Sequence, residues 1–99
     1  MAAYIIGEIE ITDPAVYNTY RAQTPGVIAQ YGGRFIVRGG EAQMLEGDRP
    51  PGRLVVVEFP DMAAARRFYA SPEYQAIIGL RQRASKGRLI LVEGHSPPR

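Results

Sequence analysis

Two glutamates and one arginine lie in segments of the sequence that read as strands, where their charges could do acid–base chemistry. Glu58 sits inside the apolar run LVVVEFP, and an unpaired carboxylate is costly to bury there. Arg38, in the preceding strand-like segment, is its expected partner. The pair is either a structural ion pair or an acid–base group in a closed cavity. Glu8 is expected on the same face of the sheet as Glu58. Two carboxylates that lie close together would suit proton transfer, so Glu58 and Glu8 are the candidate catalytic residues.

Tyrosines and a second arginine lie on helix-like segments and are candidates for holding a ligand. Tyr20 belongs to an apolar stripe of the first helix, whereas Arg21 lies one position off that stripe and is expected to be a solvated cation. Tyr74 and Arg81 share one face of the segment ASPEYQAIIGLRQR. Arg81 either buries its stem and keeps its head in water, or reaches an acidic group at a pocket rim. The predicted ligand-binding residues are Tyr20, Arg38, Tyr74 and Arg81.

The composition argues against several classes of function. The 99 residues include no cysteine and a single histidine, His95, which lies near the C-terminus. We therefore expect no metal site and no haem or other cofactor. The net charge is only +2 and a basic-aromatic signature is missing, which disfavours nucleic-acid binding. RGG at 38–40 reads as a plain bend with glycine rather than as an anion cradle. No apolar run approaches a membrane span, and a cytoplasmic location is expected.

The elements that must position these residues follow from periodicity and from turn residues. Asp13, Asp61 and Ser71 are expected to cap three helices, two of them with proline at the next position. Pro25 and Gly26 predict a kink or a restart in the first helix. Strands are predicted at residues 4–11, 34–38, 41–45, 54–59 and 88–94, and helices at about 14–31, 62–69 and 72–86.

This order predicts an α+β fold, a ferredoxin-like sandwich in which helices cover one face of an antiparallel sheet. We expect a single domain over residues 1–94 and a flexible tail at 95–99. A large apolar patch usually marks an interface, so the second sheet face should pack on another copy of the chain, forming a homodimer. The residues assigned to that face are Ile6, Glu8, Ile36, Arg38, Leu54, Val56, Glu58, Leu89 and Leu91.

Five stretches in order, AYIIGEIEITDPAVYNTYR, YGGRFIVRGG, LVVVEFPD, FYASPEYQ and RLILVEG, resemble the bacterial family known as domain of unknown function thirteen-thirty. The resemblance covers residues 2–94. It implies membership of the dimeric α/β-barrel superfamily, in which two ferredoxin-like subunits press their sheets together. That superfamily includes cofactor-free monooxygenases, lactone isomerases, haem-binding enzymes and sensor modules, so it implies an architecture and no single reaction.

Two hypotheses about function follow. The first is a small cofactor-independent enzyme, such as an isomerase, lyase or monooxygenase, that acts on a small organic molecule with Glu58 or Glu8 as base. Arg38, Arg81 and tyrosines would orient the substrate. The second is a non-catalytic dimeric module that binds a small molecule or has an accessory role. The enzyme requires an enclosed cavity with Glu58 pointing into it, whereas the module requires only a packed interface.

Overall fold

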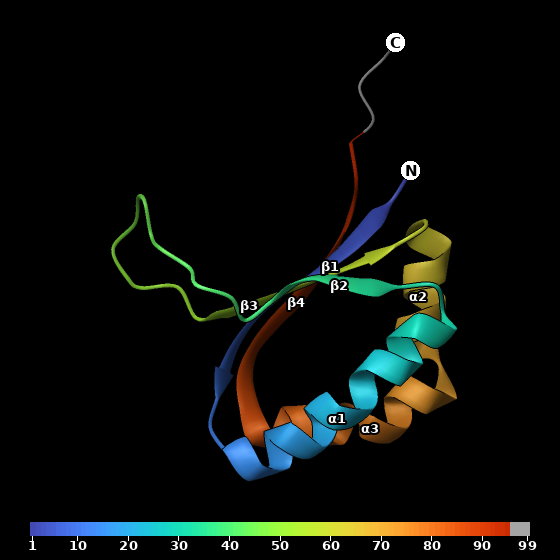
Figure 1. The fold of residues 1–99 in the computed structure, drawn as a ribbon, viewed down its shortest axis with the longest axis horizontal. Helices are drawn as coiled ribbons and strands as arrows, with labels where there is room; N and C mark the ends of the chain where they lie inside the picture. Colours follow the sequence, from blue (N-terminus) through green and yellow to red (C-terminus); the bar gives the residue numbers. More distant parts are fainter. Residues whose placement is uncertain (96–99) are drawn as a thin grey trace.

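The computed structural model describes residues 1–95, which form one four-stranded sheet and three helices (Figure 1). His95 is exposed, and the remainder of the predicted tail lies outside the described residues. The elements are β1 (Ala3–Ile11), α1 (Pro14–Gln30), β2 (Arg34–Arg38), β3 (Arg53–Phe59), α2 (Met62–Ala70), α3 (Pro72–Ala84) and β4 (Ser85–Glu93).

The sheet has the order β2-β3-β1-β4, and every neighbouring pair is antiparallel. All three helices lie on one side of this sheet (Figure 1). The predicted ferredoxin-like α+β sandwich is therefore confirmed, with β3 in the central position expected of its apolar sequence. The core lies between the sheet and the helices, and its largest fully buried side chains are Tyr74 and Phe59.

The predicted helix starts are confirmed by side-chain caps. The carboxylate of Asp13 accepts a hydrogen bond from the Val16 amide at 3.3 Å, and that of Asp61 from the Ala64 amide at 2.7 Å. The hydroxyl of Ser71 accepts from the Tyr74 amide at 3.1 Å and so begins α3. The Ser71 amide also donates to the Phe68 carbonyl, so this one residue ends α2 and starts α3.

Two predicted boundaries were wrong, and of the two alternatives for the first helix only the restart is excluded. The helix α1 runs through Pro25 as one helix, while the predicted kink stays a prediction; the Thr24 hydroxyl donates to the Tyr20 carbonyl at 2.6 Å one turn earlier. Residues 41–45 form no strand; they belong to an exposed loop that projects from the sheet (Figure 1). The strand β4 begins at Ser85, directly after α3, because an extended Ser85 ends the helix there.

The predicted membership of the two sheet faces needs correction in β2 and β4. A bulge between Phe35 and Val37 shifts the register, so that Arg38 lies opposite Val55 on the face that the helices cover. Leu89 pairs with Gly7, and Leu91 lies opposite the next helix-facing residue of β1, so both leucines are also on the helix side. The uncovered face instead carries the alternate residues Ile6, Leu54, Val56, Ile90 and Val92.

Candidate functional site

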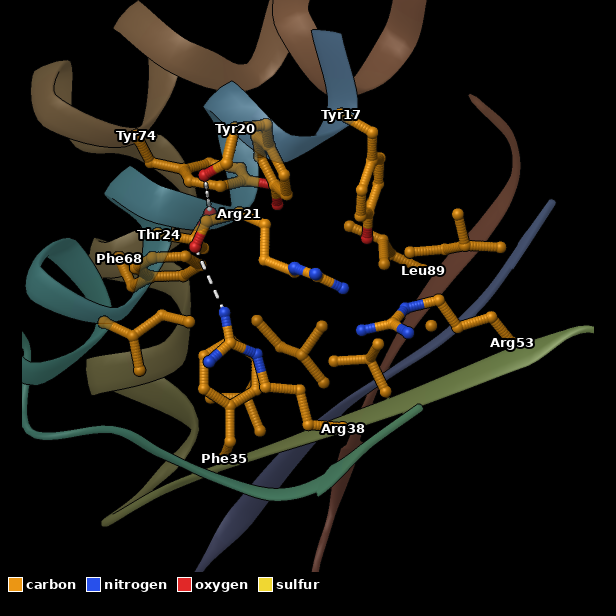
Figure 2. Close-up of a pocket in the computed structure, with 16 residues that line it drawn as sticks. Tyr17, Tyr20, Arg21, Thr24, Phe35, Arg38, Arg53, Phe68, Tyr74 and Leu89 are labelled. Atoms are coloured by element: carbon orange, nitrogen blue, oxygen red, sulfur yellow. Dashed lines mark hydrogen bonds between the residues drawn. The ribbon is translucent and has the colours of Figure 1, made fainter. Parts of the chain in front are cut away.

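A cavity of about 50 Å³ lies between the sheet and the helices (Figure 2). Gly7 helps to keep this space open, since a Cβ at this position would lie 2.8 Å from the Leu89 Cδ2 atom. The cavity is large enough to admit water or a small ligand, whereas an empty cavity of this kind costs packing energy. Its apolar lining consists of Ile5, Gly7, Ile9, Ile28, Phe35, Val55, Val57, Phe68 and Leu89.

Two tyrosines from different helices meet at one side of the cavity. The hydroxyls of Tyr20 and Tyr74 are 2.8 Å apart, and Arg81 Nε donates to the Tyr74 hydroxyl at 3.3 Å. Burial, followed by the interaction with Tyr74, raises the pKa of Tyr20 far above its ordinary value. Burial acts to lower the pKa of Arg81, but its interactions with Tyr74, Tyr20 and Tyr69 together outweigh that effect and raise it. Two phenol hydroxyls therefore meet at this wall, and Arg81 supports them from behind Tyr74.

Three arginines from three elements gather at the mouth of the cavity. Arg21 comes from α1, Arg38 from the end of β2 and Arg53 from the start of β3, and their guanidinium groups converge in Figure 2. The same three side chains line a shallow depression outside the mouth, together with Asn18 and Ala22. Neither the cavity nor this depression has a carboxylate among its described lining residues, so the mouth is strongly positive.

Arg38 is held in place by two contacts. Its guanidinium carbon lies 4.3 Å from the centre of the Phe35 ring, in cation–π geometry. Its Nη2 atom donates to the main-chain carbonyl of Arg21 at 3.1 Å (Figure 2). In a helix that carbonyl would accept from residue 25, which is proline and has no N–H. Arg38 thus supplies the hydrogen bond that Pro25 removes.

The guanidinium group of Arg53 packs directly against Gly39. A Cβ at Gly39 would collide with the Arg53 guanidinium, and Gly39 has the left-handed φ of +68°. The Gly39 amide donates to the Leu54 carbonyl at 2.8 Å, which fixes the bend that the sequence predicted. Within the described residues, the buried Nε of Arg53 has no hydrogen-bond partner. A buried donor without an acceptor is rare in folded proteins.

Glu58 forms an ion pair, but the predicted partner was wrong. Arg34, not Arg38, approaches Glu58, with Nη2 2.9 Å from Oε1, and the Tyr4 hydroxyl donates to Oε2 at 3.3 Å. The bulge in β2 explains the error, because it turns Arg38 to the opposite face. The side chain of Arg34 is 73% exposed, so this pair adds little stability.

The two predicted catalytic carboxylates do not meet. Glu58 lies opposite Tyr4 and Glu8 lies opposite Leu54, which separates them by four strand residues, or about 13 Å. Both are on the face that the helices leave uncovered, and neither lines the cavity. Their catalytic roles stay predictions, and any such role requires a second chain to enclose them.

The four predicted ligand-binding residues fall into two groups. Tyr20, Arg38 and Tyr74 line the same cavity, and Arg81 supports Tyr74 from behind. Arg81 is 9% exposed and does not line this cavity, although it borders a separate surface depression; among the described residues it forms no ion pair.

Sequence reasoning missed two of the three arginines at the mouth. Arg53 is two residues before Val55 and therefore shares its helix-facing side of β3. Arg21 stands four residues after Tyr17 and three before Thr24, which places all three on one helical face. The periodicity of these two segments therefore indicated where Arg21 and Arg53 lie. Both were missed because an arginine is usually assigned to a solvent-exposed position.

Residues 2–95 match the profile of a family described as domain of unknown function (DUF1330). The chain belongs to the DUF1330 family. No match was found among curated proteins. Within the described part of this DUF1330 chain, no group of three or more histidines, cysteines or carboxylates is placed to hold a metal, and no helix is long and apolar enough to cross a membrane.

Solved structures similar to this DUF1330 chain share its fold. A protein of unknown function from Rhodopseudomonas palustris has a TM-score of 0.77 and 21% identity, over 97% of this chain and 84% of that one. SnoaB, a cofactor-independent oxygenase from Streptomyces nogalater, has a TM-score of 0.69 and 17% identity, over 97% and 95%. An uncharacterised NIPSNAP domain protein from Burkholderia xenovorans has a TM-score of 0.55 and 19% identity, over the full length of both chains. Identities this low establish the fold alone.

Proposed function

We propose that the protein binds a small organic molecule in the cavity between its sheet and its helices. The observation that carries this proposal is an apolar cavity inside a small core, with phenols on one wall and cations at its mouth. Ligand sites are typically apolar spaces with a few polar groups that fix orientation. A core selected for stability alone would fill such a space with side chains.

Catalysis without a cofactor is the second candidate. It is favoured by the contact between Tyr20 and Tyr74, two residues that line the cavity, and by the shared fold with a cofactor-independent oxygenase. The described lining has no carboxylate or histidine to act as base. Within the cavity, the reaction would therefore depend on stabilising negative charge on the substrate by Arg38 and the phenols. Glu58 or Glu8 could serve as base only from the other face of the sheet.

We further propose that the protein is a homodimer whose subunits meet through the uncovered sheet faces. Ile90 and Val92 are 46% and 42% exposed on that face, and Ile6 and Val56 lie beside them in the register. Exposed aliphatic side chains in adjacent strands are typical of a buried interface. Light scattering at micromolar concentration should give the mass of two chains.

A charge placed in the proposed interface tests the dimer. Ile90→Lys should yield monomers, because an unpaired ammonium group would be buried against the partner. Ala29→Lys adds the same charge on the exposed side of α1 and should leave the dimer intact. A monomeric wild-type protein would contradict the proposed assembly.

Ligand binding is tested by a thermal-shift screen of small aromatic and aliphatic compounds, because a ligand that binds the native state raises its melting temperature. Val55→Phe should abolish the shifts, since the added ring would occupy the space beside Gly7, its partner in β1. Gly26→Ala is the matched control, because a Cβ there meets nothing within 4 Å. Compounds that raise the melting temperature of Val55→Phe as much as that of Gly26→Ala would contradict binding in the cavity.

A further inference from the structure

The mouth of the cavity concentrates positive charge without compensation. The described residues contain one ion pair, Arg34–Glu58, and it lies on the other face of the sheet. Arg21, Arg38 and Arg53 therefore face one space with no carboxylate to neutralise them. Like charges that converge in a partly enclosed space repel one another, and an anion bound among them would relieve the repulsion.

The three side chains differ in how firmly they are held. Arg38 is fixed by the Phe35 ring and the Arg21 carbonyl (Figure 2). The Arg53 guanidinium packs against Gly39, and its Nε atom is buried. Arg21 itself is exposed on α1. Two ordered guanidinium groups are thus preorganised beside the cavity, which reduces the entropy lost when a ligand binds.

The donors left free at this mouth match a planar anion. The Nη2 atom of Arg38 is used by the Arg21 carbonyl, whereas the Arg53 side chain lines both the cavity and the depression outside it, and its buried Nε has no described acceptor. A guanidinium presents its donors in a fork that fits the two oxygens of a carboxylate. Behind the arginines, the lining is aliphatic and aromatic, so the remainder of the ligand must be apolar.

We propose that the ligand is a small organic carboxylate, with its carboxylate among Arg38, Arg53 and Arg21 and its apolar body in the cavity. This inference rests on the proposed ligand-binding function and names the chemical class of the ligand. A neutral analogue of the same shape fills the cavity equally well but leaves the guanidinium donors without a charged acceptor. Charge at one end of the ligand is therefore the basis of selection.

The test uses benzoate and benzamide, which have nearly the same shape and differ in charge. Titration calorimetry at pH 8 should give at least tenfold tighter binding of benzoate, and binding should weaken as salt is raised. Arg53→Met should weaken benzoate binding about 10- to 100-fold and change benzamide binding by less than threefold. Arg83→Met removes the same charge from an exposed position on α3 and should leave both affinities unchanged.

The outcomes separate this inference from the proposed function. If benzamide binds as tightly as benzoate and Val55→Phe blocks both, the cavity binds ligands but charge does not select them, and the inference fails alone. If Arg53→Met and Arg83→Met weaken benzoate equally, the effect is one of net charge and the inference is wrong. If neither compound binds and the screen finds no cavity ligand, the proposed function fails and the inference fails with it.

Discussion

Arg38 donates a hydrogen bond to the main-chain carbonyl of Arg21, at 3.1 Å, across the gap between β2 and α1. Pro25 leaves this carbonyl without its helical donor, and the β2 bulge brings Arg38 to the correct face of the sheet to replace it. A proline in one element and an irregularity in another therefore combine to place a cation at the mouth of the cavity.

This relationship predicts that Pro25 and Arg38 are energetically coupled. Pro25→Ala should raise the free energy of unfolding by about 1–3 kcal/mol, because alanine restores the helical N–H and has better helix propensity. Arg38→Met should lower the free energy of unfolding by about 1 kcal/mol in the wild-type protein and by much less in the Pro25→Ala background. Urea denaturation of the four proteins measures the coupling; an equal cost of Arg38→Met in both backgrounds would contradict it.

The joint between α2 and α3 should depend on the Ser71 hydroxyl. This buried group accepts from the Tyr74 amide and donates to the Phe68 carbonyl at 2.7 Å. Ser71→Ala should lower the free energy of unfolding by about 1–2 kcal/mol, measured by calorimetry. Ser71→Thr retains a hydroxyl and should recover most of the loss, whereas an unchanged stability of Ser71→Ala would show that the cap is unimportant.

The raised pKa of Tyr20 predicts a pH dependence. Below pH 10, Tyr20 is protonated in both states, so its contribution to stability is constant. Above pH 10 the unfolded chain loses the Tyr20 proton while burial keeps it on the folded chain, and stability falls by up to about 1.4 kcal/mol per pH unit.

Comparison with Tyr20→Phe isolates this contribution, because the other tyrosines are common to both proteins. The free energy by which the wild type is more stable than Tyr20→Phe, measured by urea denaturation at pH 9, 10 and 11, should decrease as the pH rises. An advantage that stays constant over this range would mean that Tyr20 ionises with an ordinary pKa in the folded protein.

Most of the fold could be predicted from the sequence because each predictive feature involves residues that are close together in the chain. Asp13, Asp61 and Ser71 cap helices through atoms three residues away, and alternation in β1 assigns its faces without knowledge of a partner strand. The family resemblance implied the dimeric α/β-barrel architecture. These local signals were sufficient to predict the ferredoxin-like sandwich.

The errors came from features that depend on residues far apart in the sequence. The β2 bulge is defined only by the pairing of Phe35 and Val37 with β3, and it moved Arg38 from one sheet face to the other. If the bulge is not taken into account, Arg38 is predicted on the same sheet face as Glu58. The grouping of Arg38 with Arg21 and Arg53 then cannot be predicted. Tyr20 and Tyr74 were both predicted as ligand-binding residues, but their direct contact spans 54 positions and had no local signal.

A crystal structure of the protein with benzoate at saturating concentration tests the central claim most directly. The account predicts a ring packed between Gly7, Val55 and Tyr74, with carboxylate oxygens about 3 Å from donors of Arg53 and Arg38. A cavity that stays empty, or a benzoate bound only outside these arginines, would contradict it.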